Sequence, residues 1–88
     1  MYRVVLASAC VTSEVAEEVA RDITQEFTRR PWHTNAKCEW DGIRLVLQAD
    51  NDFDSKGVAL RDEFSDAISA YIKKPLDCGI DIVSIKEV

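Results

Sequence analysis

Apolar and polar positions along this chain follow two different periods, and the change of period predicts the secondary structure. Over residues 13–30 and 54–73, apolar side chains recur at spacings of three and four, which places them on one stripe of a helix. Four shorter segments either alternate or are rich in β-forming residues, as strands are: 2–8, 36–40, 43–49 and 80–88. The predicted order is strand, helix, strand, strand, helix, strand.

The first helix carries signals at both ends. Thr12 or Ser13 is a suitable N-terminal cap, and acidic residues fill the first turn that follows. Arg29 and Arg30 are expected in the last turn, where cations interact favourably with the helix dipole. Pro31 then ends the helix.

The second helix is expected to run from Asp54 or Ser55 to Lys73, with Pro75 closing it. Its apolar stripe faces the core. The polar residues between the stripe positions, Glu63 among them, are expected to face away from it. The last strand follows after a turn.

The segment between the helices contains Asp41-Gly42 flanked by apolar residues, a strong signal for a two-residue hairpin turn. A two-residue loop sets the register, with Trp40 opposite Ile43 and Glu39 opposite Arg44 as a cross-strand ion pair. One face of this hairpin is apolar and the other is largely charged. The hairpin therefore has a core face and an outer face.

Right-handed crossovers and a hairpin between the two halves favour a split βαβ arrangement. The predicted class is α+β, with a four-stranded antiparallel sheet in the order 4-1-3-2 and both helices on one face. This βαββαβ arrangement resembles the ferredoxin-like superfold over the whole chain. The resemblance implies an architecture and no activity, because that fold hosts many unrelated functions.

The composition is that of an ordinary globular protein. With 88 residues, 47% hydrophobic and 31% charged, the chain is expected to form one domain over 1–88. It shows no signal peptide and no membrane-spanning run, so a cytoplasmic protein without a membrane partner is expected. The formal net charge of −5 repels polyanions and disfavours nucleic acid as a partner.

The three cysteines, Cys10, Cys38 and Cys78, form no C-x-x-C pair, and their odd number argues against a disulfide framework. Free thiols are the expected state. Cys10 precedes the first helix, whose dipole can lower the pKa of a thiol, and the fold brings Cys78 to the same end of the sheet. These two are a redox candidate, and the alternative is two unreactive reduced thiols. Cys38 is expected in the core.

The only histidine, His33, is expected at the opposite end of the sheet, near Asp50, Asp52 and Asp54. A histidine with two or three carboxylates can hold a divalent metal or act as an acid–base pair. His33, Asp50 and Asp52 are therefore the candidate site, with a divalent metal as the one cofactor considered. In the alternative interpretation, one aspartate caps the second helix and the others favour its positive end.

The sheet has a second face without helices, which the hairpin supplies with four candidate interface residues: Lys37, Glu39, Arg44 and Val46. The first strand adds either Tyr2, Val4 and Leu6 or Arg3, Val5 and Ala7, and the last strand either Val83 and Ile85 or Ile80 and Ile82. An apolar centre with a polar rim is typical of a protein-binding or self-association surface.

Two hypotheses follow for the function. The first is a small binding or regulatory module that acts through the exposed sheet face, on a protein partner or as a homodimer, and is not an enzyme. The second is a metal-dependent or acid–base enzyme site at His33 with Asp50 and Asp52. The sequence contains no catalytic motif that decides between them.

Overall fold

The computed structural model describes residues 1–71 and 79–88. Its six elements occur in the predicted order: β1 (Tyr2–Ser8), α1 (Ser13–Thr28), β2 (Thr34–Trp40), β3 (Leu45–Asn51), α2 (Val58–Ser69) and β4 (Ile80–Glu87). The strands form one antiparallel sheet in the order β2-β3-β1-β4. This is the predicted arrangement, consistent with a ferredoxin-like topology.

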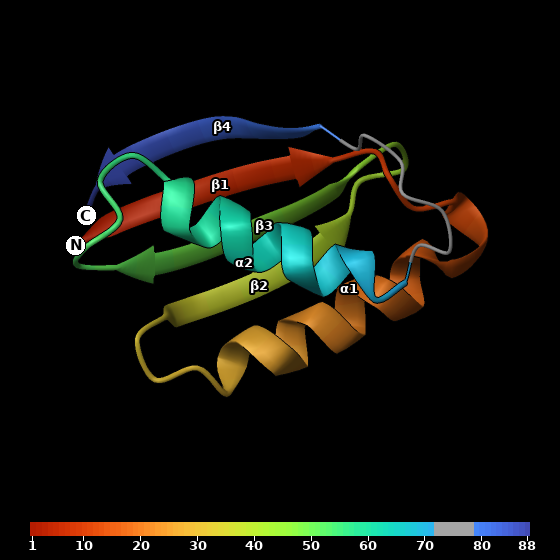
Figure 1. The fold of residues 1–88 in the computed structure, drawn as a ribbon, viewed down its shortest axis with the longest axis horizontal. Helices are drawn as coiled ribbons and strands as arrows, with labels where there is room; N and C mark the ends of the chain where they lie inside the picture. Colours follow the sequence, from red (N-terminus) through yellow and green to blue (C-terminus); the bar gives the residue numbers. More distant parts are fainter. Residues whose placement is uncertain (72–78) are drawn as a thin grey trace.

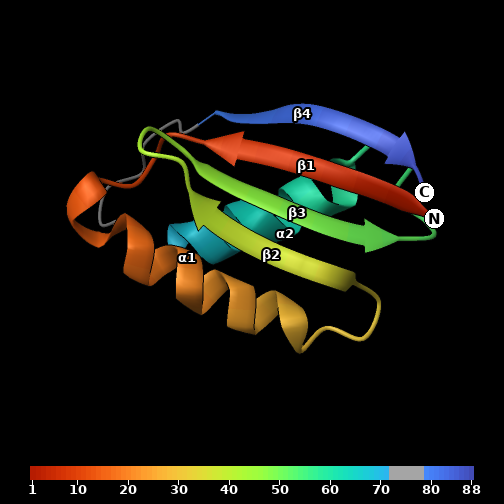
Figure 2. The same ribbon diagram turned by 180° about the vertical axis from the view of Figure 1, so that it is seen from behind.

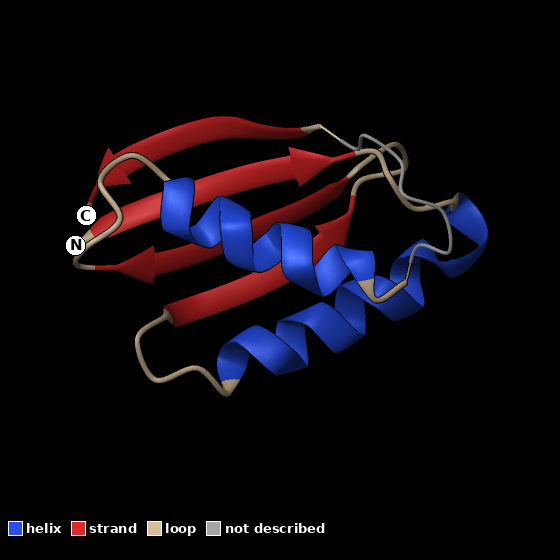
Figure 3. Cartoon of the chain, in the orientation of Figure 1, coloured by secondary structure: helices blue, strands red, loops and turns tan. Residues whose placement is uncertain are grey.

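The molecule has two layers. Both helices lie against one face of the sheet, with α2 across its middle and α1 beside β2 (Figures 1 and 3). On the other face, no helix of the described residues is present (Figure 2). Within the described residues, no helix has both the length and the apolar character needed to cross a bilayer.

The core lies between the sheet and the helices and is built from the predicted stripes. The fully buried side chains of greatest volume are Phe27 on α1 and Phe64 on α2, with Leu6 on the central strand β1. Each of these removes a large apolar surface from water, which is worth about 1.5–3 kcal/mol per side chain. Val15, an apolar residue of the segment 13–30 for which a buried stripe was predicted, is 41% exposed, because Ala16 takes the core-facing position beside it.

The connection between β2 and β3 corrects the predicted two-residue turn. Trp40 lies opposite Leu45 instead of Ile43, so the loop spans four residues, 41–44. Asp41 closes it: its N–H donates to the Arg44 carbonyl at 3.0 Å, and its carboxylate accepts the N–H groups of Ile43 and Arg44 at 2.8 and 2.6 Å. The N–H groups of Arg44 and Ile43 hold the pKa of Asp41 below its usual value. A side chain that bonds its own turn competes with the tighter hairpin.

The wider loop shifts the pairing by two residues, with Glu39 opposite Val46 and Cys38 opposite Leu47. Because side chains alternate with a period of two, an even shift leaves each one on its predicted face. The predicted ion pair between Glu39 and Arg44 is wrong, since Arg44 lies in the loop. Glu39 instead pairs with Lys37 along its own strand, at 2.8 Å.

Helix α2 begins later than predicted, at Val58 instead of Asp54 or Ser55. Gly57 precedes it with φ of +75°, a left-handed conformation that turns the chain before the helix starts. Asp54 still caps the helix from a distance, because its two carboxylate oxygens accept the N–H groups of Ala59 and Leu60 at 3.1 and 2.9 Å. The predicted end of this helix, at Lys73 and Pro75, lies outside the described residues. The first helix also ends earlier than predicted, at Thr28.

The pairing of β1 with β3 and with β4 settles the register that the sequence left open for the first and last strands. Arg3, Val5 and Ala7 lie opposite Asp50, Gln48 and Val46 and share the open side of the sheet with them. Between Val5 and Leu6 the pairing with β4 slips by one residue, so that Val83 is extra. Both Ile82 and Ile85 consequently face the helix side, a combination that neither alternative for this strand contained.

Replacing Gly57 by alanine is expected to destabilise the fold by about 1–2 kcal/mol or more, because a side chain at positive φ is strained. A Cβ at Gly57 would also lie only 3.2 Å from Val4 Cγ1. Gly79→Ala is the matched control, since a Cβ there meets nothing within 4 Å. Urea denaturation measures both. Equal midpoints for the two variants would show that the turn at Gly57 tolerates a side chain.

Candidate functional site

The segment between α1 and β2 brings His33 into the protein. After α1 ends, the N–H of Arg30 donates to the Phe27 carbonyl, and the N–H of His33 donates to the Arg30 carbonyl, each at 3.2 Å. These two turns reverse the chain and direct the imidazole inward, where the residue is only 5% exposed. A buried histidine needs a polar partner.

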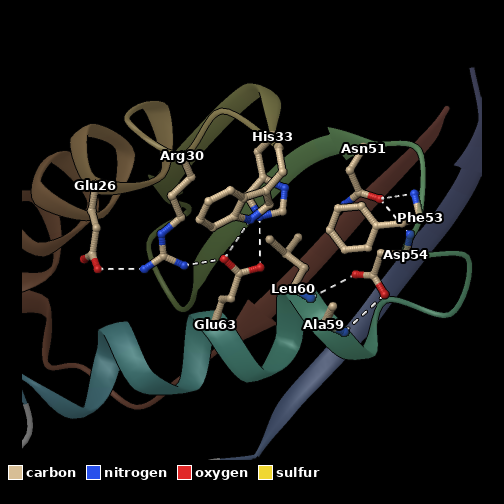
Figure 4. Close-up of polar contacts among 10 residues, drawn as sticks. Glu26, Arg30, His33, Asn51, Phe53, Asp54, Ala59, Leu60 and Glu63 are labelled. Carbon is tan, nitrogen blue, oxygen red and sulfur yellow. Dashed lines mark hydrogen bonds and ion pairs between the residues drawn. The ribbon is translucent and has the colours of Figure 1, made fainter.

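That partner is Glu63, which projects from α2 towards the segment (Figure 4). One carboxylate oxygen accepts the Arg30 guanidinium at 2.5 Å and the Trp32 indole N–H at 3.1 Å, and the other lies 3.0 Å from His33 Nε2. Arg30 also bonds Glu26 at 2.9 Å, one turn earlier on α1. We call Arg30, Trp32, His33 and Glu63 the Glu63 cluster.

Aromatic rings enclose the imidazole of His33. Its ring centroid is 5.8 Å from that of Phe27, 6.0 Å from that of Trp32 and 6.2 Å from that of Phe53. Phe27 is in the core, and the guanidinium of Arg30 lies over its ring at 4.3 Å. Trp32 and Phe53 are each about half exposed, so the histidine lies under two aromatic side chains at the surface.

Partial burial alone would raise the pKa of Glu63, but hydrogen bonds from His33 and Arg30 outweigh it and hold that pKa below its usual value. The carboxylate is therefore charged and fully engaged. Its position opposite Nε2 favours the tautomer in which Nε2 donates, which leaves Nδ1 as a buried acceptor with no partner among the described residues. This arrangement fixes the loop on α2.

Asp50 belongs to a different cluster. Its carboxylate accepts two hydrogen bonds from the Arg3 guanidinium, at 2.9 and 3.0 Å, and one from the Asn35 amide at 2.9 Å. The bonds from Arg3, together with that from Asn35, lower the pKa of Asp50 in spite of its burial. This cluster lies on the open side of the sheet, whereas His33 contacts the helix layer. The structure therefore does not bring Asp50 and His33 together.

The remaining aspartates are also apart. Asp52 is exposed in the loop after β3, and Asp54 is buried with both oxygens on the N-terminus of α2, as the alternative interpretation of these acids expected. In the described ranges, no group of three histidine, cysteine or acidic side chains is placed to hold a metal ion. His33 and Asp50 instead contact separate partners, Glu63 and Arg3, while Asp52 is exposed.

Sequence reasoning missed Glu63, which it placed on the solvent side of the second helix. The signal was available in its spacing: Glu63 is three residues after the buried Leu60 and directly precedes Phe64, so it lies at the border of the apolar stripe. A carboxylate at that border can reach a buried donor.

The cysteines occupy different environments. Cys38 is free and buried in the core, as expected, and burial together with the charge of Glu39 raises its pKa to about 12, so it stays protonated. Cys10 is half-buried against the core and is disulfide-bonded, so the expectation of free thiols is wrong for this residue. Cys78, the other redox candidate, lies outside the described residues.

The open face is the side of the sheet without helices (Figure 2). We define it by the side chains that point to that side from the three strands β1, β2 and β3: Arg3, Val5, Ala7, Lys37, Glu39, Val46, Gln48 and Asp50. Its centre is apolar and its margin carries both signs of charge. Three of the four predicted interface residues belong to it, and the fourth, Arg44, lies in the adjoining loop.

Comparisons with known proteins give no assignment for this arrangement. The chain matches no protein-family model, no curated protein and no solved structure.

Replacing Glu63 by glutamine is expected to reduce the free energy of unfolding by about 1–3 kcal/mol, because the variant leaves charged and buried donors without their anion. Asp62→Asn is the matched control: it removes a carboxylate at the exposed neighbouring position and is expected to change stability by less than about 0.5 kcal/mol. Urea denaturation at pH 7 measures both. Equal losses for the two variants would contradict the role of Glu63 as the anchor of the segment.

Acid is expected to destabilise the fold through Asp50 and Glu63. Both have a pKa lower in the folded chain than the usual 3.8 and 4.5, so their contribution is complete above those values and is lost as the pH falls through the folded-state values. The free energy of unfolding should therefore fall between about pH 5 and pH 2.

Asp50→Asn should make the decrease in the free energy of unfolding with falling pH less steep. Asp52→Asn is the control, because it removes an exposed acid from the neighbouring loop. Urea titrations at several pH values measure the slope. A slope for Asp50→Asn as steep as that of the unmodified chain would contradict the assignment.

Proposed function

We propose that this chain is a small binding or regulatory module that acts through its open face, and that a second copy of the chain is the partner in a face-to-face homodimer. The observation that carries the proposal is the apolar centre of a sheet face that neither described helix covers. Val5 and Val46 are only partly buried there, on either side of the buried Ala7. Such a centre gains free energy when a partner removes it from water.

The charges around this centre support a protein partner. Lys37 and Glu39 are exposed on β2, and Arg3 with Asp50 forms an ion pair at the other margin. A margin with both signs of charge can be matched by a second copy turned so that lysine faces glutamate. The formal net charge of −5 gives no attraction for nucleic acid.

The alternative enzyme function has less support. His33 and Asp50 lie on opposite sides of the sheet, and each is committed to a structural partner, Glu63 and Arg3 respectively. Asp54 is likewise used by the helix. A site that combined them would have to break all three sets of contacts.

Val46→Lys tests the face. The new lysine lies opposite Glu39, an arrangement that favours the monomer fold, but it places a charge in the apolar centre. The variant should lose face-to-face self-association, measured as molar mass by light scattering after size exclusion. Ile43→Lys is the control, since Ile43 is 74% exposed in the loop and outside the open face. A molar mass that Val46→Lys leaves unchanged would overturn the proposal of a face-to-face dimer.

A further inference from the structure

The two edge strands of the sheet, β2 and β4, differ in whether a described element contacts their outer backbone groups. At the β2 edge, the Cys38 N–H donates to Thr24 Oγ1 at 2.8 Å, and the same hydroxyl lies 3.1 Å from the Cys38 carbonyl oxygen. Helix α1 thus engages the backbone of Cys38, which this edge strand would otherwise offer to another chain. Figure 1 shows α1 alongside β2, and no described element alongside the outer edge of β4.

The hydrogen-bond pattern tells which backbone groups of β4 point outward. The Val88 N–H donates to the Met1 carbonyl at 2.8 Å, and in an antiparallel ladder every second residue is hydrogen-bonded to the neighbour. The backbone N–H and C=O groups of Lys86 and Ser84 therefore point to β1. Those of Ile85 and Glu87 point away from the sheet.

The same alternation holds for the part of β4 that precedes the bulge. Asp81 lies opposite Ala7, two residues along β1 from Val5, and so directs its backbone groups to β1. Ile80 and Ile82 consequently direct theirs outward. The outer edge of β4 offers the backbone groups of four residues, Ile80, Ile82, Ile85 and Glu87.

The bulge also gives β4 an internal symmetry in its side chains. Asp81 and Lys86 lie opposite Ala7 and Arg3, so both are on the open side of the sheet. Ile82 and Ile85 are on the helix side, where their Cδ1 atoms lie 3.5 and 3.3 Å from the position of a Cβ at Gly57. Without the extra residue, Asp81 and Lys86 would be on opposite faces.

We propose that β4 pairs antiparallel with β4 of a second copy, about a two-fold axis between Val83 and Ser84. In this register the partner's Lys86 lies opposite Asp81, and the partner's Ile85 lies opposite Ile82. The outward backbone groups also match, because Ile82 meets the partner's Ile85 and Ile80 meets the partner's Glu87. The two sheets then form one continuous sheet of eight strands.

A second copy fits this edge better than an unrelated strand. Only one register pairs each of the four residues whose backbone points outward with another such residue of the second copy. The same register places Asp81 opposite Lys86 and Ile82 opposite Ile85. Ile82, 37% exposed in one copy, gains apolar contact on the helix side when the copies join. The contact is independent of the proposed function, since it leaves the open faces of both copies uncovered and side by side.

Charge reversal tests the register. Lys86→Asp and Asp81→Lys each place like charges opposite each other twice across the two-fold axis, and each should weaken self-association about tenfold or more. Both side chains are exposed, so neither variant should change the fold. The measurement is sedimentation equilibrium from about 10 μM to about 1 mM, the range suited to a small interface.

Two recombinations sharpen the test. The double variant with Asp81→Lys and Lys86→Asp should regain the association, because each pair again has opposite charges. An equimolar mixture of the two single variants should also associate, since both pairs in the mixed dimer are then attractive. Each of these chains is also measured with the Val46→Lys substitution added. That substitution removes any contact through the open face, so the association that remains reports on β4 pairing alone.

Amide exchange gives the second readout. The N–H groups of Ile82 and Ile85 should become protected as the protein concentration rises, and Lys86→Asp should abolish that gain. A face-to-face dimer would not protect them. The proposal is overturned if the chain in the Val46→Lys background stays monomeric to about 1 mM, or if the single, double and mixed variants all associate equally.

Discussion

The two helices are linked through the carboxylate of Glu63. It receives donors from Arg30, Trp32 and His33, which follow α1, while it belongs to α2 itself. The polar contacts therefore join the helix of the first βαβ half to that of the second. Both halves also supply side chains to the shared core. The fold of the segment 29–33, the burial of the histidine and the position of the half-exposed Trp32 all depend on this contact.

Such a contact has a cost as well as a benefit. Burial opposes the charge of Glu63, and the hydrogen bonds from His33 and Arg30 contribute most to keeping its pKa low. Arg30 is shared with Glu26, so the cluster is a short network and not an isolated pair. A network of this kind specifies one orientation of the loop, since any other orientation leaves a buried charge or a buried donor without its partner.

The fold was predictable because its determinants are periodic. The stripes that contain Phe27 and Phe64, and the apolar run from Val4 to Ala7 in the first strand, indicated the elements and their faces. What failed depended on single residues acting over a short stretch of chain: the Asp41 carboxylate bonds the four-residue hairpin loop, and the left-handed backbone of Gly57 precedes the later start of the second helix. The separation of His33 from Asp50 was not predictable for a related reason. His33 and Asp50 are close to the same end of the sheet, but the sequence does not show that a sheet lies between them.

Thr24 has a consequence for how far association can spread. A sheet with two uncovered edges can add copies without limit and grow into a ribbon, which is the route from strand pairing to fibres. In this chain the hydroxyl of Thr24 occupies the backbone N–H of Cys38 on β2, so a strand that added to that edge would have to displace this contact. One threonine on a helix thereby opposes growth of such a ribbon through β2.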